Sequence, residues 1–589
     1  MSNQPRANTS RLKQRWNIIA EHFRDRLSYI DALPQLTFLG LIVGICAALL
    51  IVAFRFSIEI PLFWFLENNT DNFEGLSRFW HFALPAAGAI VIGIAMNYLA
   101  PSSRQVSVSH VLDRLHNHQG QLPAKNVAVQ FFGGIASLVT GQSVGREGPA
   151  VHLGAGAASL LGQWLKLPNN SLRTLVGCGV AAAISASFNT PMAGVIFAME
   201  VVLMEYTITG FIPVILASVS GAVISQIVFG EDPSIVVNPG QMNSLLEIPF
   251  MAFAGVVIGL IATLYLTFQD HLKAVKSMPL ILRFACIGIV TGALALIAPQ
   301  ILGLGYDTLE GAMNGEIGLN MLLIIIAAKL VATAISTGLG MPGGVIGPML
   351  VIGGCIGGVL GYVGNIFYPQ YAADAGFYVT LGMAAMMGAV LNAPLAALMA
   401  VLELTYNPNA IFPSMVVIVM ACVVSQQIFR REGVFVAQLR AMGTPLRAEP
   451  DRQVLSRAGV RSVMSTKFVA SDAVINTSNI SVLLAHYPDW IVLSDDDTLH
   501  VLRAADLAKW LDQFKEDDSS APEKVNLLEI PGQRYQPVGV HARANLFEAR
   551  NIMIKAHSDL IYVERPHARH TNQVMGIINA EMINNFYRN

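Results

Sequence analysis

The stretch Gly141-Gln-Ser-Val-Gly145-Arg146-Glu147-Gly148-Pro149 places two charged residues inside an otherwise apolar part of the chain. Glu147 stands directly before Gly-Pro, a pair that starts a helix cleanly and lets a ligand approach the backbone. A helix N-terminus has unpaired N–H groups and partial positive charge, so it attracts a carboxylate and a small anion alike. The stretch predicts a site where Glu147 and an anion compete for one place. A Glu147 that only caps the helix and pairs with Arg146 fits the same residues.

A related stretch follows about 200 residues later, and it contains no charge. It reads Gly340-Met-Pro342-Gly-Gly344-Val-Ile346-Gly-Pro348. Neighbouring residues match as well, because Thr140-Gly141 and the later Gly154 correspond to Thr337-Gly338 and the later Gly353. The second stretch offers only backbone N–H groups and an apolar wall, so it indicates an anion site only together with the first stretch.

A second pair of segments repeats in the same order and at a similar distance. Asn189-Thr-Pro191-Met-Ala193 leads into an apolar run that ends at Glu200, and Asn392-Ala-Pro394-Leu-Ala396 leads into one that ends at Glu403. Two ordered matches indicate that half of the chain is duplicated. Duplicated halves of transporters often insert with opposite topology and meet at the bilayer midplane, where broken helices form the substrate site. We expect Glu200 and Glu403 to make buried hydrogen bonds near a helix end or at a dimer contact.

Composition identifies a membrane protein. Hydrophobic residues make up 53% of 589 residues and charged residues 13%, whereas soluble domains carry about 25% charged residues. Several apolar stretches approach the roughly 20 residues that span a bilayer, while 125–139 and 149–165 are short and interrupted by glycine. The prediction is an all-α polytopic membrane domain over 34–440, with two inverted repeats of broken and tilted helices at about 34–230 and 248–440.

The Gly-Arg-Glu-Gly-Pro run, the Gly-x-x-x-Pro run at 344–348 and the repeated Asn-x-Pro-x-Ala helices resemble the CLC family of chloride channels and proton-coupled chloride antiporters. The match covers about residues 35–440. The resemblance implies a homodimer with one pore in each subunit, chloride as the substrate, no required cofactor, and Glu147 as the gating glutamate. The chloride-binding residues that it implies are Gly145, Arg146, Gly148, Gly344, Val345, Ile346, Phe435 and Ser107.

Three positions depart from the family pattern. The family's first anion motif, Gly-Ser-Gly-Ile-Pro, is missing. The corresponding stretch reads Arg104-Gln-Val106-Ser107-Val108-Ser109-His110. Its alignment to the motif is open, so Ser107 is a candidate for the family's chloride-coordinating serine. Phe435 aligns with the pore tyrosine and has no hydroxyl for the ion. Antiporters of the family usually carry a proton-accepting glutamate directly after the position of Glu200, and here this residue is Val201.

Val201 favours a passive chloride channel gated by Glu147. The alternative is a proton–chloride antiporter with Glu205 or His152 as a substitute proton relay, although each also fits a packing role. A fluoride exporter is disfavoured because the second motif is of the ordinary chloride type. A hypothesis of another class is a membrane sensor with a vestigial pore. We expect no enzyme, because the apolar stretches contain no nucleophile–base pair or metal cluster.

The rest of the chain reads as soluble. Residues 456–512 and 525–589 predict two small α/β units that resemble a divergent pair of cystathionine-β-synthase-type (CBS) domains, a cytoplasmic addition of many CLC proteins. In that resemblance Asp506 or Glu581 could contact a nucleotide ribose, and solvated helix starts fit them equally.

The ends of the membrane domain are basic. The N-terminal segment 1–33 holds six Lys/Arg against three acids, and Arg430, Arg431, Arg440 and Arg447 follow the last apolar stretch. By the positive-inside tendency both termini are expected in the cytoplasm, with the protein in a bacterial inner membrane. The net charge of −2 argues against a nucleic-acid partner.

Overall fold

The computed structural model describes residues 21–29, 32–66, 71–230, 240–367, 373–444, 450–495, 498–516, 522–564 and 574–588. The first 20 residues and Arg447, which carry part of the basic charge discussed above, lie outside the described residues. The chain divides into two compact units. The larger comprises Leu36–Leu165 and Leu172–Arg447, and the smaller comprises the residues up to Gln35, the short segment Lys166–Ser171 and Ala448–Asn589.

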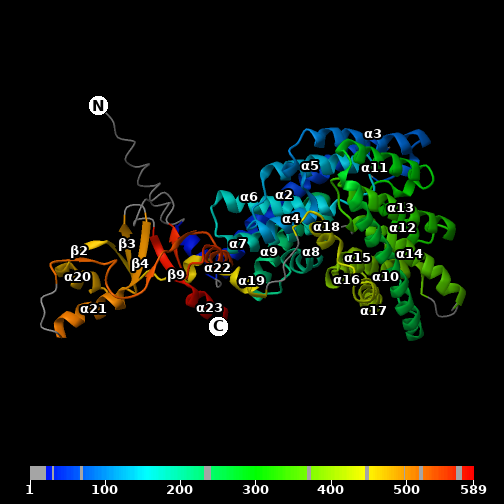
Figure 1. Cartoon of the computed structure of the whole chain (residues 1–589). Coiled ribbons are helices and arrows are strands. Elements are labelled where there is room, and N and C mark those ends of the chain that lie inside the picture. The colour runs from blue at the N-terminus through cyan, green and yellow to red at the C-terminus, as the bar shows by residue number, and fades with distance from the viewer. Residues whose placement is uncertain are drawn as a thin grey trace, which may run out of the picture. The chain divides into compact units, whose positions relative to one another are not determined.

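The larger unit is helical (Figure 1). Eight helices in the described part of the chain are long and apolar enough to cross a bilayer. Its helices are α2 (Leu33–Phe65), α3 (Arg78–Asn97), α4 (Ser107–Asn117), α5 (Ala124–Val139), α6 (Glu147–Trp164), α7 (Asn169–Phe188), α8 (Pro191–Phe197), α9 (Ile208–Phe229), α10 (Ile248–His271), α11 (Leu280–Ala295), α12 (Tyr306–Met313), α13 (Leu319–Leu339), α14 (Ile346–Phe367), α15 (Ala375–Leu391), α16 (Pro394–Thr405), α17 (Ile411–Cys422) and α18 (Val434–Ala441). The predicted polytopic all-α domain is confirmed.

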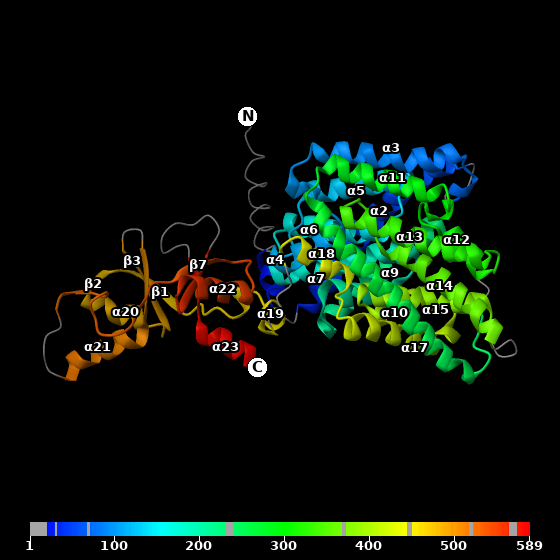
Figure 2. The ribbon, with the colours of Figure 1, turned by 45° about the vertical axis from the view of Figure 1, so that its right-hand side comes forward.

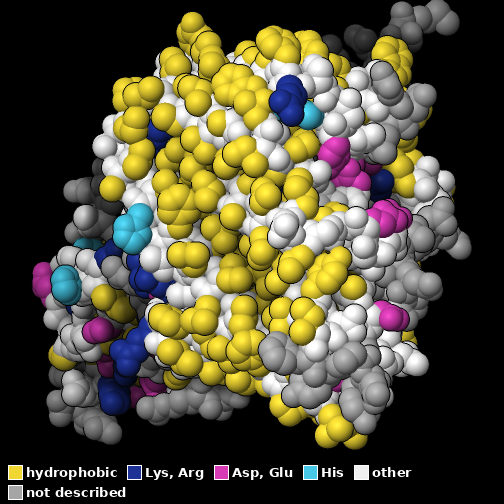
Figure 3. Space-filling model, turned by 90° about the vertical axis from the view of Figure 1, so that its right-hand side faces the viewer, with side chains coloured by type: hydrophobic (Ala, Val, Ile, Leu, Met, Phe, Trp, Pro, Cys, Tyr) yellow, Lys and Arg dark blue, Asp and Glu magenta, His cyan; other side chains and the backbone are white. Residues whose placement is uncertain are grey.

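The outer surface of this unit is apolar. Many large hydrophobic side chains are exposed, among them Trp64, Phe79 and Ile208. Figure 3 shows one face on which hydrophobic side chains form a broad continuous area, while charged side chains gather toward its margins. Soluble monomers rarely expose apolar patches of more than a few hundred Å². The surface therefore fits contact with lipid, as expected of a multi-pass integral membrane protein.

The duplicated sequence becomes a duplicated packing arrangement. Helices α6 and α7 follow the first motif as α14 and α15 follow the second, and in each pair two glycines meet. A Cβ atom added to Gly154 would lie 2.2 Å from the carbonyl oxygen of Gly179, and one added to Gly353 would lie 2.3 Å from that of Gly382. Small residues let the backbones of membrane helices touch. The repeated glycine in the sequence thus marks the same close helix crossing in both halves.

Each half also caps a helix of the other half. The Glu403 carboxylate accepts hydrogen bonds from Met192 N at 2.9 Å and Ala193 N at 2.7 Å, in the first turn of α8. Glu200 does the same for α16, accepting from Leu395 N at 3.3 Å and Ala396 N at 2.7 Å. A carboxylate satisfies the unpaired N–H groups and complements the positive helix end. Both acids therefore make the hydrogen bonds at a helix end that we expected.

The smaller unit contains the predicted pair of α/β modules (Figure 2). Parallel strands β1 and β3 and then antiparallel β3 and β4 form the first module, and β7, β8 and β9 repeat this pattern in the second. In both modules a helix lies between the first two strands in sequence and another follows the third. The elements are β1 (Phe468–Asp472), α20 (Ile480–Leu484), β3 (Trp490–Asp495), β4 (Thr498–Arg503), α21 (Ala504–Glu516), β7 (Val538–His541), α22 (Leu546–Ala556), β8 (Leu560–Glu564), β9 (Val574–Asn579) and α23 (Ala580–Arg588). The CBS-like fold is confirmed.

Gly353→Ala tests the helix crossing. The added methyl group would overlap the Gly382 carbonyl, and overpacking of this kind costs about 1–3 kcal/mol. We expect a lower thermal unfolding temperature for the purified protein in detergent. Gly311→Ala is the matched control, because Gly311 lies inside α12 and an added Cβ would be 3.5 Å from its nearest neighbour. Alanine has a higher helix propensity than glycine, so the unfolding temperature of this variant should stay the same or rise. Equal destabilisation by both variants would contradict the proposed role of the crossing.

Candidate functional site

The two motifs are hydrogen-bonded to each other. Gly145 N donates to Gly344 O at 2.8 Å, and Gly344 N donates to Gly145 O at 2.7 Å, which forms an isolated antiparallel bridge. The paired residues are equivalent positions of the two halves, so a pseudo-two-fold axis passes between them. Helices α6 and α14 begin two residues after these glycines. The bridge therefore brings two helix N-termini together, and it occupies the N–H groups of both glycines.

Glu147 lies in this junction. It is the first residue of α6 and is 1% exposed. A Cβ atom added to Gly145 would lie 1.9 Å from Glu147 Oε2, and one added to Gly347 would lie 2.8 Å from Oε1. The carboxylate thus occupies the space that the absent side chains leave, between the starts of α6 and α14. Gly148 packs just behind it, since its own added Cβ would meet Gly344 Cα at 2.7 Å.

Tyr306 contacts Glu147 and was not among the residues predicted from the sequence. Its hydroxyl donates to Glu147 Oε1 at 3.2 Å. Tyr306 begins α12, and its backbone N–H donates to Asp71 Oδ2 at 2.7 Å. Asp71 lies in the loop before α3, where burial raises its pKa to about 6. The sequence signal was Gly303-Leu-Gly305 before an aromatic residue, which predicts a turn and a helix start but not the contact with a glutamate 159 residues away.

Arg146 is buried beside the junction and forms its ion pair elsewhere. Its Nη1 lies 3.7 Å from Glu59 Oε1 on α2. Its guanidinium carbon is 4.8 Å from the centroid of the Phe188 ring and 5.6 Å from that of Tyr306. These contacts hold a positive charge close to Glu147. The ion pair with Glu59 replaces the simple Arg146–Glu147 pair that the sequence also allowed.

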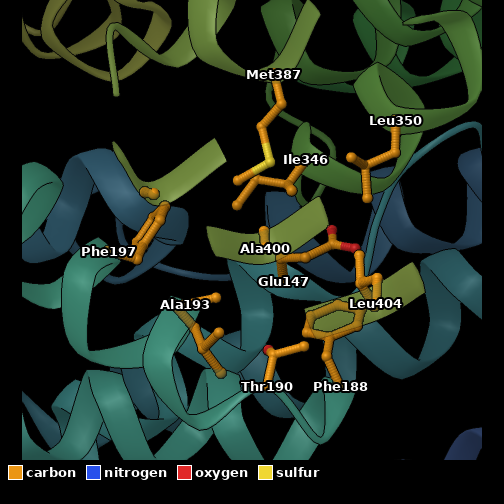
Figure 4. Close-up of a pocket in the computed structure, with 12 residues that line it drawn as sticks. Glu147, Phe188, Thr190, Ala193, Phe197, Ile346, Leu350, Met387, Ala400 and Leu404 are labelled. Carbon is orange, nitrogen blue, oxygen red and sulfur yellow. The ribbon is translucent and has the colours of Figure 1, made fainter. Parts of the chain in front are cut away.

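A small cavity of about 30 Å³ borders Glu147. Figure 4 shows the Glu147 side chain among apolar side chains from α7, α14, α15 and α16. Glu147 and Thr190 are the polar members of its lining, and the other members are Ile184, Phe188, Ala193, Phe197, Ile346, Leu350, Met387, Ala396, Ala400 and Leu404. A volume of this size is enough for a water molecule. Ile346 of the second motif lines this cavity together with the carboxylate of Glu147.

A larger cavity of about 300 Å³ reaches the other side of the second motif. Val345 and Gly343 line it together with Ser107 from the start of α4. Ser107 has a φ of +73°, and its N–H donates to Gln130 Oε1 at 2.6 Å. A left-handed φ favours glycine. Ser107 therefore lines one cavity with residues of the second motif, and Gln130 occupies its backbone donor.

The remaining predicted residues take other positions. Phe435 is buried at the start of α18 with its ring centroid 6.4 Å from that of Phe197. Val201 is buried in a π-helical turn at Ala198–Leu203. Glu205 is ion-paired with Arg173, at 2.9 Å. None of these three predicted residues lines either cavity.

His152 is buried on α6 and contacts a second histidine. Its Nε2 is 2.8 Å from His110 Nδ1, and the two rings are stacked with centroids 5.1 Å apart. His110 in turn lies 3.2 Å from the Nε of Arg114. The sequence had pointed to His152 alone, and only the fold joins it to His110.

The architecture and the junction of two helix N-termini around a carboxylate define a membrane protein for small anions. The sequence pattern of the family described as voltage gated chloride channel matches residues 87–426. The chain belongs to this family, the CLC family, as the sequence motifs predicted. CLC-type anion transport is accordingly its function at this level of detail.

Individual relatives agree with this assignment. The chain is 28% identical over 393 residues to a ClcB-like protein of Ralstonia nicotianae, covering 65% of this chain and 90% of that protein. It is 28% identical over 418 residues to the H⁺/Cl⁻ exchange transporter ClcA of Salmonella agona, covering 68% of this chain and 88% of that protein. Two solved structures share the fold. A slow cyanobacterial Cl⁻/H⁺ antiporter has a TM-score of 0.62 at 20% identity, covering 69% of this chain and 97% of that one. A eukaryotic CLC transporter has a TM-score of 0.60 at 16% identity, covering 93% of this chain and 97% of that one.

Tyr306→Phe tests the contact with Glu147. Loss of a hydrogen bond worth about 0.5–1.5 kcal/mol would favour release of the carboxylate from the junction. We expect chloride efflux from liposomes at pH 7 to rise about two- to tenfold. Tyr362→Phe is the control, because that hydroxyl donates to Ile317 O. A flux that is unchanged by Tyr306→Phe, or raised equally by both variants, would show that the Tyr306 contact does not hold Glu147 in place.

Proposed function

We propose that this protein is a passive chloride channel in which Glu147 is the gate. The observation that carries the proposal is the position of the Glu147 carboxylate at the junction of two helix N-termini. Backbone N–H groups there can replace part of the hydration shell of an anion without a full positive charge, which permits release. While the carboxylate occupies the junction, it excludes chloride. Protonation removes its charge and opens the path.

The surroundings of position 201 support passive over coupled transport. Val201 cannot carry a proton, and the hydroxyl-free Phe435 stands where the family has a tyrosine. Glu205, one candidate for a substitute relay, is engaged by Arg173 at 2.9 Å. A proton route from Glu205 to Glu147 would therefore have to break that pair in every cycle.

A proton–chloride antiporter is the second candidate function. It is favoured by relatives that are named H⁺/Cl⁻ exchangers and by the contact between His152 and His110. Imidazoles in contact can pass a proton from one ring to the next. This pair is the substitute relay that an antiporter mechanism would use in place of the missing glutamate.

The left-handed backbone of Ser107 supports one register for the Gly-Ser-Gly-Ile-Pro motif. In the motif Gly-Ser-Gly-Ile-Pro a glycine follows the serine, and a φ of +73° suits that glycine. We assign Ser107 to the second glycine and Val106 to the serine. The site then lacks both side-chain hydroxyls of the family, and its chloride ligands are backbone N–H groups. Among the predicted ligands, Val345, directly before α14, and Ile346, its first residue, supply these groups.

Further properties come with family membership. We propose a homodimer with one pathway in each subunit, both termini in the cytoplasm and a location in a bacterial inner membrane. The CBS-like unit is a site where a nucleotide could act through Asp506 or Glu581, each in the first turn of a helix. A membrane sensor with a vestigial pore is the remaining alternative, and it predicts no ion flux.

The reversal potential in reconstituted liposomes under a chloride gradient distinguishes these functions. For a passive channel it equals the chloride equilibrium potential, and an opposing pH gradient leaves it unchanged. A shift with the proton gradient would establish coupled transport. His152→Ala should then reduce the shift if the histidine pair is the relay, whereas Glu205→Gln should not. Absence of current under all gradients would favour the sensor.

Glu147→Gln tests the gate. A neutral amide cannot be protonated or repel the ion, so the variant should conduct chloride at pH 7.5 at about the rate that the wild type reaches at low pH. Between pH 4.5 and 7.5 its flux should stay constant, while the wild-type flux rises as pH falls. Liposome chloride efflux, measured with a chloride electrode, provides the comparison. A variant that kept the pH dependence of the wild type would exclude Glu147 as the titrating gate.

A further inference from the structure

The 300 Å³ cavity beside the second motif carries positive charge without a compensating acid. Its lining includes Arg104 and Arg283, and no Asp or Glu is among the lining residues, all of which belong to the described part of the chain. Two like charges that share one cavity repel each other, and the repulsion is stronger away from bulk water. An anion placed between them would remove this cost.

Both guanidinium groups have donors left for a ligand. Arg104 is fixed by bonds from Nε to Leu99 O at 2.9 Å and from Nη2 to Asn97 O at 3.0 Å. A guanidinium has five N–H groups, so others remain. Arg283 Nε is buried and has no hydrogen-bond partner among the described residues. Leaving a buried donor unpaired is unfavourable. The other N–H groups of Arg283, a residue that lines the cavity, are the ones that a ligand with several acceptor oxygens would contact.

The size of the cavity and the helices around it define the chemistry of the ligand. At about 300 Å³ it reaches the lower end of small-molecule sites and is far larger than the roughly 30 Å³ share of a water molecule. Helices α4 and α11 both begin in its wall, at Ser107 and Leu280. Helix starts and arginine forks are the groups that bind tetrahedral oxyanions.

We propose that this cavity binds a phosphate-type oxyanion between Arg104 and Arg283, and that the bound oxyanion slows anion passage. The second half of this inference rests on the proposed function. Ser107, Gly343 and Val345 line the same cavity, so an occupant stands directly beside the second motif. Free phosphate and the phosphate of a lipid head group share the required chemistry.

Binding is tested first without transport. Inorganic phosphate should raise the thermal unfolding temperature of the purified full-length protein above that in sodium chloride of equal ionic strength. In Arg104→Gln and Arg283→Gln the phosphate concentration for half-maximal stabilisation should rise at least tenfold. Arg78→Gln, at an exposed arginine outside the cavity, should behave as the wild type. No stabilisation of the wild type, or equal stabilisation of all variants, would overturn the site.

Transport is tested by chloride efflux from liposomes of neutral lipid, with phosphate added to one side at a time. Each variant is normalised to its own phosphate-free flux, which also shows that it has folded. Phosphate should inhibit the wild type, and the two cavity variants should need at least tenfold more. If vesicles that contain phosphatidylglycerol show the same inhibition without added phosphate, the source is a lipid. Binding without inhibition would overturn the regulatory role, and absence of any chloride flux would overturn the proposed function while the binding result still decides the site.

Discussion

The membrane unit depends on the backbone pairing of Gly145 with Gly344. This bridge places the N-termini of α6 and α14 against each other, and each carries partial positive charge and unpaired N–H groups. Two such ends repel unless negative charge lies between them. The Glu147 carboxylate supplies that charge, and in the proposed mechanism chloride takes its place. Gating and anion binding would then be two ways to satisfy one electrostatic requirement.

The surrounding architecture keeps the two helix ends in place by repeated small-residue contacts. Gly154 against Gly179 and Gly353 against Gly382 allow the paired helices of both halves to touch. The cross-capping of α8 by Glu403 and of α16 by Glu200 ties one half to the other. These interactions come in equivalent pairs, one member of each pair in either half.

Charges near the junction serve different purposes although they look alike in the sequence. Arg146 is held by Glu59 and two aromatic rings, so its charge raises the electrostatic potential next to Glu147. Arg104 and Arg283 lie in a cavity without acids, where a ligand would balance them. Glu205 is neutralised by Arg173. Local sequence alone does not separate these cases, because partner identity depends on helices distant in the chain.

From the sequence we could predict the membrane class, the duplication, the CBS-like tail and Glu147 as the central residue. Each of these rests on composition or on local motifs, which record the requirements of a bilayer or of a helix start. Tertiary structure alone decided that Tyr306 binds Glu147, that His110 meets His152 and that Gln130 occupies the N–H group of Ser107. These partners are separated by 159, 42 and 23 residues, and no local pattern encodes such a pairing. It arises only when packing of the apolar helices brings their polar side chains together.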